Sequence, residues 1–410
     1  MKKFYIMLAA LSVTASMAAQ QLPNAGFEDD WAACSPYTGG ETTTSGTTPA
    51  AWTIANVAGY KIKILGWMGK TTVGDKTEGY ESASAVLLKN SPNSVVKAQT
   101  VPGYITLGTT WNTANTLGAE KDGGSFGGID FAYRPDAILF DYKRTLAEGS
   151  NEQATVIAYI WTGSTSQADV PVSIGSKPTT TTMVNRDRNI LDMETAKGGD
   201  VTKSDDFELV SKINYAIQEA QDTWKSLEIP FKYLSDKTPE KINVIFGAGN
   251  YFSTEPKQGN ELTVDNVKLV YYSRLSGLKF KDADIADFDP DKFDYALDEV
   301  MPTNEADLKA TTMGNSGVAK AAVELDQQNN VATITVTNDH GTDADDQNSH
   351  VYTVKFLPAG SSINDVIDMT SADVRYVDLY GNAVAADALV NGQTYIKLVN
   401  GKATKVIANN

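Results

Sequence analysis

Apolar and polar residues alternate along several short stretches of the chain, and "AILFDYKR" is the clearest of them. Its apolar residues Ile138, Phe140 and Tyr142 fall on one face of an extended chain. Asp141 and Lys143 fall on the opposite face. Because the side chains of a strand point alternately to its two faces, this pattern predicts a strand with one face against a core.

Further strands are predicted nearby, at "ATVIAYIW", "WKSLEIPF", "KINVIFGAG" and "ELTVDNVKLVYY". One segment, "DFELVSKINYAIQEAQ", has a mixed pattern and predicts a short helical turn followed by a strand from about Lys212. Strands rich in Val, Ile, Thr and Tyr, separated by Gly, Asn, Asp and Ser, favour an all-β fold made of two packed sheets.

The strand pattern divides the chain into three parts. Residues 22–273 form the longest part and predict a large β-sandwich. Residues 274–358 begin with an acidic run, end in alternating strands, and have the length of a small immunoglobulin-like sandwich. Residues 359–410 carry two or three short predicted strands and are expected to form a small β appendage.

The first residues predict a targeting segment rather than a part of the fold. "MKK" is a basic start, "FYIMLAALSV" is a short apolar run, and residues 16–18 offer a cleavage site. We expect cleavage near Ala18 and export to the periplasm, the cell surface or the medium. No later run approaches the roughly 20 apolar residues of a membrane-spanning helix, so no membrane insertion is expected.

Charge narrows the choice of partners. The chain carries 35 basic and 51 acidic residues, a formal net charge of −16. This balance argues against nucleic acid and against anionic membranes, because both need a basic surface. Neutral glycans or divalent cations fit better. The single cysteine, Cys34, allows no disulfide within the chain, so the fold depends on its core.

Catalytic motifs are scarce. The sequence has no Cys–His pair at a recognisable spacing, and it matches G-x-S-x-G only at residues 123–127, within the glycine-rich run GGSFGG. His340 and His350 lie in one acidic stretch without the spacing of a zinc site, and we interpret that stretch as a solvated loop. Glycoside hydrolysis needs only two suitably spaced carboxylates. Asp130, Asp136 and Asp141 would be the first candidates, and the alternative is that they lie on the surface at strand edges.

Aromatic residues suggest where a glycan could bind. All six tryptophans lie before residue 225. Sugars pack their C–H faces on aromatic rings and pair their hydroxyls with planar polar groups. The candidate glycan-binding residues are Trp111, Asn112, Arg134, Asp136 and Trp161. The alternative interpretation is that most tryptophans of a sandwich belong to its core.

Two motifs resemble the ends of jelly-roll carbohydrate-binding modules. They are "N-x-G-F-E", at residues 24–28, and "L-x-V-D-N-V-x-L-x-Y", at residues 262–271. In those modules the first and last strands lie side by side, and their carboxylates hold a structural calcium ion. The resemblance implies Glu28 and Asp265 as ligands of Ca²⁺, which prefers oxygen donors. The alternative is that Glu28 caps a turn and Asp265 faces water.

The whole of residues 22–273 resembles the putative carbohydrate metabolism domain family of exported bacterial proteins, although residues 164–206 depart from its pattern. The resemblance rests on the succession "LPNAGFEDDW", "FAYRPDAILFDYK", "VIAYIW", "WKSLEIPFKY", "KINVIFGAGNY" and "GNELTVDNVKLVYYS". It implies a jelly-roll β-sandwich that handles glycans, without implying a reaction. Residues 274–358 resemble cadherin-like or immunoglobulin-like modules, which act as spacers or contact other surface proteins.

Three functions therefore remain open. The first is an exported, non-catalytic protein that binds a neutral oligo- or polysaccharide, with the second module as a spacer. The second is a glycoside hydrolase that uses a carboxylate pair in the first domain. The third is a structural surface or adhesion protein. Composition and motifs favour the first.

Overall fold

The computed structural model divides into two compact units, and the predicted signal peptide lies outside the residues it describes. The first unit comprises Met1–Tyr272, Gly314–Ala319 and Asn338–Asn348, and the second comprises Ser273–Met313, Lys320–Thr337 and Ser349–Asn410. The described residues are 21–33, 37–38, 46–56, 60–62, 66–68, 71–94, 97–112, 123–163, 167–174, 177–184, 208–253, 255–357, 375–379, 381–385, 388–399 and 402–408.

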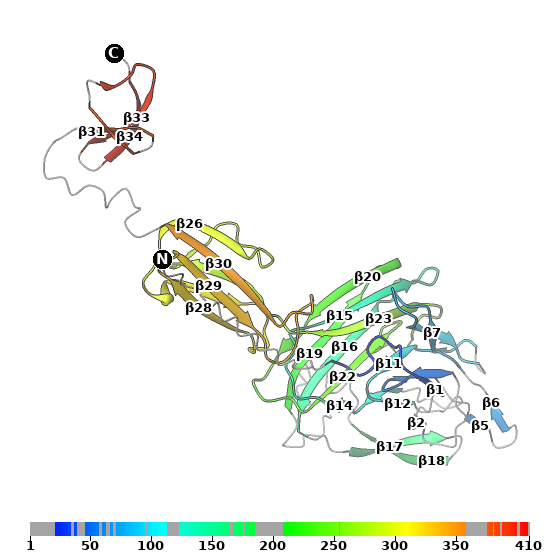
Figure 1. Cartoon of the computed structure of the whole chain (residues 1–410). Coiled ribbons are helices and arrows are strands. Elements are labelled where there is room, and N and C mark those ends of the chain that lie inside the picture. The colour runs from blue at the N-terminus through cyan, green and yellow to red at the C-terminus, as the bar shows by residue number, and fades with distance from the viewer. Residues whose placement is uncertain are drawn as a thin grey trace, which may run out of the picture. The chain divides into compact units, whose positions relative to one another are not determined.

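Two large sheets build the first unit (Figure 1). The five-stranded sheet has the order β20 (Gln221–Pro230), β15 (Ala137–Thr145), β23 (Glu261–Val270), β8 (Ala85–Lys89) and β7 (Gly74–Thr77). The seven-stranded sheet has the order β21 (Lys232–Tyr233), β19 (Glu208–Ile217), β16 (Ala154–Thr162), β22 (Lys241–Gly247), β11 (Tyr104–Thr106) and β4 (Thr53–Ile54), with β14 (Ile129–Asp130) also pairing with β22. Every pairing within these two sheets is antiparallel.

Shorter strands complete the first unit. They are β1 (Trp31–Ala33) with β3 (Thr47–Pro49), β9 (Ser91–Pro92) with β10 (Thr100–Val101), β2 (Tyr37–Thr38) with β12 (Thr109–Asn112) and β13 (Gly123–Phe126), β5 (Tyr60–Ile62) with β6 (Gly66–Met68), and β17 (Gln167–Ile174) with β18 (Lys177–Val184).

The alternation seen in the sequence decides which faces meet in the core. Ile138 and Phe140 of β15 point inward and are fully buried. Phe140 meets Phe246 of β22 edge to face, with ring centroids 5.0 Å apart. Because these two strands belong to different sheets, the contact joins the sheets across the core, and the predicted all-β sandwich is confirmed.

Two local predictions need correction. The segment expected to start with a helical turn is a strand from Glu208, because Glu208 already pairs with Thr162 of β16. The segment at residues 24–28, expected as a first strand, is a turn in which Asn24 and Phe27 have positive φ. It still lies beside β23, since the Val267 N–H donates to the Ala25 carbonyl at 2.9 Å.

The second unit contains two sheets with their own core. The three-stranded sheet has the order β25 (Ala283–Asp284), β24 (Leu275–Phe280) and β27 (Leu308–Thr312). The 3-10 turn η2 (Glu305–Asp307) comes directly before β27 in the chain. The four-stranded sheet has the order β26 (Asp294–Val300), β30 (Ser349–Leu357), β29 (Val331–Thr337) and β28 (Lys320–Asp326). Leu278, Ile334 and Tyr352 are among the buried residues of this core. This part is a small β-sandwich, and its immunoglobulin-like identity stays a prediction.

A last sheet follows near the end of the chain. Its order is β32 (Ala383–Val384), β31 (Arg375–Val377), β33 (Thr394–Val399) and β34 (Lys402–Ile407). Tyr395 is one of its few buried apolar residues, while Leu379 and Ile407 are largely exposed. In the part of the chain that the structure describes, no helix has the length and apolar character needed to cross a membrane.

Candidate functional site

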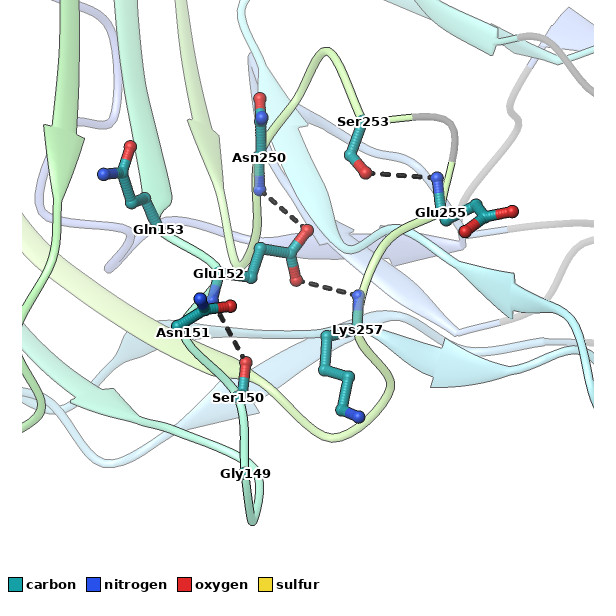
Figure 2. Close-up of a pocket in the computed structure, with 9 residues that line it drawn as sticks. All are labelled: Gly149, Ser150, Asn151, Glu152, Gln153, Asn250, Ser253, Glu255 and Lys257. Carbon is teal, nitrogen blue, oxygen red and sulfur yellow. Dashed lines mark hydrogen bonds between the residues drawn. The ribbon is translucent and has the colours of Figure 1, made fainter.

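A polar pocket lies where strands β15 and β22 end. Its volume is about 370 Å³, and it is formed by the loop that follows β15 and the loop that joins β22 to β23. The lining residues are Gly149, Ser150, Asn151, Glu152, Gln153, Asn250, Ser253, Glu255 and Lys257 (Figure 2). The volume falls within the range of small-molecule sites.

The Glu152 carboxylate holds the two loops together. Its Oε1 accepts from the backbone N–H of Asn250 at 3.1 Å, and its Oε2 accepts from the backbone N–H of Lys257 at 2.8 Å (Figure 2). The fully buried side-chain amides of Asn90 and Asn260 donate to the same Oε2 at 3.1 and 2.8 Å. Hydrogen bonds to a charged group contribute about 1.5–3 kcal/mol each, so Glu152 fixes the shape of the pocket before any ligand arrives.

Two further residues support Glu152. Arg144, at the end of β15, is only 1% exposed and donates to the backbone carbonyls of Glu152, Ile217 and Gln218. Gly249 leaves room for the carboxylate, because a Cβ there would lie 2.7 Å from Oε1 of Glu152. The pocket therefore rests on a rigid polar base.

The pocket suits an uncharged, hydroxyl-rich ligand. Its lining amides and hydroxyls can both donate and accept hydrogen bonds, as sugar hydroxyls do. The two exposed charged side chains at its rim, Glu255 and Lys257, have opposite signs. Figure 2 shows the Lys257 side chain directed away from the Glu152 carboxylate, so its ammonium is not used in holding the loops.

Sequence reasoning missed this pocket. Glu152 is one of many acidic residues, and its partners Asn90 and Lys257 are 62 and 105 positions away. The only local signal is "GAGN", in which Gly249 precedes Asn250 at the end of a predicted strand. A glycine in such a place indicates a close approach of another group, without saying which group.

The predicted calcium ligands lie around one loop. Oδ2 of Asp265 accepts from the Tyr80 N–H and from the Ser82 hydroxyl, both at 2.7 Å. Oε1 of Glu28 accepts from the Ser84 N–H at 2.9 Å. Burial raises the pKa of Asp265, and the neighbouring charge of Glu28 adds to this effect. The structure thus brings together two carboxylates that are more than 200 positions apart in the sequence.

The two carboxylates offer oxygen atoms to a hard cation, but they already accept from the N–H groups of Tyr80, Ser84 and Asn266. One further oxygen nearby, the hydroxyl of Ser84, is buried without a hydrogen-bond partner within the described part of the chain. That same part contains no group of three or more His, Cys, Asp or Glu side chains placed to hold a metal. A calcium ion at Glu28 and Asp265 would therefore take its other ligands from hydroxyls or backbone carbonyls, both of which Ca²⁺ accepts.

Arg134, a predicted glycan contact, holds loops of the first unit together. Its guanidinium donates to the backbone carbonyls of Ser316 at 2.9 Å, Lys237 at 2.9 Å and Ser235 at 3.0 Å. It also lies over the ring of Tyr233, 4.2 Å from the centroid. These contacts use the N–H groups and one flat face of the guanidinium, so they support a structural role for Arg134. They give no support to its predicted glycan contact.

Asp136, predicted beside Arg134 as a glycan contact, is 2% exposed. Its carboxylate accepts from the backbone N–H groups of Tyr272 and Ser316, each at 3.0 Å. Gly314 has φ +89° and passes so close that a Cβ there would lie 2.1 Å from Oδ1 of Asp136. Burial raises the pKa of Asp136 to about 6, although these hydrogen bonds oppose the shift. The segment Gly314–Ala319 thus covers this carboxylate.

Among the three carboxylates considered for glycoside hydrolysis, Asp136 and Asp141 do not form a pair. Asp136 and Asp141 are separated by five extended residues, which is about 17 Å and well beyond the spacing of a glycosidase pair. Asp130 lies at the surface in a 2.6 Å ion pair with Lys241, which lowers the pKa of Asp130. The Asp141 carboxylate accepts from the Ser226 hydroxyl. Each of the three therefore has a separate role.

The predicted tryptophan contacts lie in different settings. Trp161 is 5% exposed and packs against Tyr159, with ring centroids 5.2 Å apart, which supports its alternative interpretation as a core residue. Trp111 and Asn112 lie on β12, between β13 and β2, and their side chains are outside what the structure describes. Their predicted glycan contacts stay predictions.

The two histidines are packed rather than solvated, which corrects the interpretation of their loop. In the first unit, Nδ1 of His340 accepts from the Arg134 N–H at 3.3 Å, and its ring meets Tyr133 edge to face. In the second unit, His350 is buried, with Nδ1 2.8 Å from the Ser273 hydroxyl. Acidic neighbours in the sequence gave no indication of these contacts.

Comparison with known proteins gives only remote likenesses. No family model matches the chain, and no curated protein matches it. Among solved structures, it is similar to a putative glycoside hydrolase from Bacteroides thetaiotaomicron, with 15% identity and a TM-score of 0.31 over 49% of this chain and 57% of that chain. The chain thus spans little more than half the length of that protein.

Two other similar structures are a putative glycoside hydrolase from Bacteroides vulgatus and a family 16 carbohydrate-binding module. The first has 11% identity and a TM-score of 0.32 over 48% of this chain and 76% of that chain. The second has 8% identity and a TM-score of 0.24 over 48% of this chain and 85% of that chain. All three proteins are named for carbohydrate cleavage or binding. At such TM-scores the fold of this chain rests on its own strand pairings, and membership of the carbohydrate metabolism domain family stays a prediction.

Proposed function

We propose that the chain is an exported, non-catalytic glycan-binding protein whose first unit holds a neutral sugar in the Glu152 pocket. The observation that carries the proposal is the pocket itself, about 370 Å³ in volume and lined by amide, hydroxyl and oppositely charged side chains. Its loops are held by Glu152 and Arg144, so binding would not require them to become ordered first. The second unit would serve as a spacer or would contact other surface proteins.

The test is a glycan array on the mature protein, followed by titration calorimetry with the best glycan. Gln153→Ala and Lys257→Ala remove pocket side chains without touching the hydrogen bonds of Glu152, and each should weaken binding about tenfold, or 1.4 kcal/mol. Trp111→Ala, in the same assay, tests the site predicted from sequence. Lys225→Ala, an exposed lysine on β20, is the control. Unchanged affinity in both pocket variants would contradict the proposed site.

The same material distinguishes the other two functions. Reducing sugar released from the bound glycan would identify a glycoside hydrolase, and we expect none. Silence on the array, together with binding to another surface protein, would favour a structural or adhesion protein instead. Both outcomes would contradict the proposal.

We also propose that Glu28 and Asp265 hold a structural calcium ion, as their resemblance to jelly-roll modules implies. The support is the convergence of the two carboxylates around one loop, together with the Ser84 hydroxyl, which has no hydrogen-bond partner among the described residues. An ion that binds only the folded chain at 100 times its dissociation constant adds about 2.7 kcal/mol of stability. Calcium should therefore raise the melting temperature, and Asp265→Asn should abolish the rise. A melting curve that EDTA leaves unchanged would contradict the site.

A further inference from the structure

The outer face of the five-stranded sheet carries two neighbouring aromatic rings. Trp224 lies on the edge strand β20, and Tyr80 lies in the loop between β7 and β8. Their ring centroids are 5.7 Å apart, with an interplanar angle of 35°. Alternation places Trp224 on the face of β20 opposite to buried Ile229. Both rings are half-buried, so part of each is accessible to solvent.

Charged and polar groups surround the rings. Lys143 of β15 places its ammonium 4.6 Å from the centroid of the Trp224 ring. Among the residues that the structure describes, no carboxylate forms an ion pair with Lys143. Asp141, two positions earlier on the same face, accepts from the side-chain amide of Asn266 at 3.0 Å. That amide also donates to the backbone carbonyl of Tyr80 at 3.2 Å, which ties the loop of Tyr80 to the sheet.

We propose that Tyr80, Trp224 and Lys143 form a second glycan-binding surface, which takes the pyranose rings of a neutral polysaccharide. A sugar hydroxyl that accepts from the Lys143 ammonium would be held above the indole, where the C–H face of the sugar meets the aromatic pair. Lys143 and Asp141 bring opposite charges to this face, so an uncharged ligand fits better than an acidic one. An open sheet face, unlike a pocket, can accept internal units of a chain.

This inference rests on the proposed glycan-binding function, but it concerns other residues, so the two can fail separately. The experiment is affinity electrophoresis of the full mature chain in gels that contain a soluble neutral polysaccharide, with β-glucan and galactomannan as probes and polygalacturonate as the acidic counterpart. Trp224→Ala and Tyr80→Ala remove a ring. Lys143→Met keeps the aliphatic stem over Trp224 and removes only the charge. Lys225→Met, on the opposite face of β20, is the matched control.

We expect the neutral probe to retard the unaltered protein and Lys225→Met equally. Each of the three surface variants should weaken this retardation by a factor of up to about ten, the size of a single aromatic contact. Melting curves check that all three surface variants remain folded, and Lys143→Met makes the smallest change because it keeps the aliphatic stem over Trp224. If all three surface variants were retarded as fully as the unaltered protein while Gln153→Ala was retarded less, the inference would be overturned. The pocket would then remain the proposed site. If polygalacturonate retarded the protein more than the neutral probes did, and Lys143→Met abolished that retardation, the proposal of a neutral ligand would be overturned. Absence of retardation in every gel would overturn this second surface, and the glycan array would then decide separately on the pocket.

Discussion

The two ends of strand β15 use a carboxylate in different ways. At one end, Glu152 accepts from four N–H donors and stands beside an open pocket. At the other end, about 30 Å away along nine extended residues, Asp136 accepts from the backbone of two segments and is covered by Gly314–Ala319. The same chemistry therefore leaves an open pocket at one end and, at the other, a closed joint made of Arg134, Asp136 and Gly314–Ala319.

The difference shows what a carboxylate can and cannot indicate. In both places its role is to hold loops by accepting backbone N–H groups, which needs no ligand. What makes one end a candidate site is the open pocket that amide and hydroxyl side chains line around the fixed loops. At the other end, Arg134 donates to backbone carbonyls of the first unit, and Asp136 accepts from a backbone N–H of the same unit.

The largest effect is expected for Glu152→Gln. A glutamine keeps one acceptor oxygen but turns an NH2 group towards N–H donors, so the free energy of unfolding should fall by about 2–4 kcal/mol. Urea unfolding measures this loss, and the pocket should lose its ligand at the same time. Glu255→Gln makes the same substitution at the exposed rim and should change stability by less than about 0.5 kcal/mol. If both variants changed the free energy of unfolding equally, Glu152 would not differ from the exposed Glu255 in supporting the loops.

Asp136 should make stability depend on pH. Its folded pKa of about 6 lies above the ordinary aspartate value of 3.8, so its contribution is fully present below about pH 4. That contribution falls as the pH rises through 6, by roughly 2–3 kcal/mol in all. The difference between the unfolding curves of the unaltered protein and Asp136→Asn, measured from pH 4 to 7, isolates this effect. Asp130→Asn, at an exposed ion pair, should not reproduce this pH dependence. A difference curve that does not change with pH would contradict the raised pKa of Asp136.

Arg134→Lys tests the closed joint by a smaller change. Lysine offers a point charge in place of a planar fork, so it cannot reach the carbonyls of Ser235, Lys237 and Ser316 together. We expect a loss of about 1–2 kcal/mol in unfolding free energy, with faster hydrogen exchange in Gly314–Ala319. The exposed Arg375→Lys in the last sheet should have no effect. If glycan affinity fell while stability and exchange stayed unchanged, Arg134 would be a ligand contact, as its sequence context predicted.

The smallest effect should come from Lys257→Ala. Only the backbone N–H of Lys257 contacts Glu152, so removing the side chain should change the free energy of unfolding by less than about 0.5 kcal/mol. Urea unfolding checks this value beside the binding titration of the same variant. A large loss of stability would show that the Lys257 side chain supports the loops and does not line a free pocket.

The strand pattern was readable from the sequence because alternation is a local property. Ile138, Phe140 and Tyr142 are spaced so that one face of β15 had to be buried, and the structure confirms this. Local reading failed at residues 24–28, where the chain turns at Asn24 and Phe27 and still lies beside β23. It also failed at Glu208, where pairing with β16 outweighs a helix-like spacing of apolar residues.

Roles of single polar residues depended on neighbours that are distant in the sequence. Trp161 looks the same in the sequence whether it faces a sugar or the core, and only the packing of the two sheets buries it. The pairing of Glu28 with Asp265 was anticipated through a resemblance rather than through spacing.

By itself, the sequence determined the all-β architecture and the net negative charge of the chain, because these follow from local periodicity and from composition. The tertiary structure alone decided which carboxylates hold loops, which aromatic rings remain accessible and where a pocket stays open. These properties arise when residues such as Asn90, Glu152 and Lys257 meet in space, and no local pattern records that meeting.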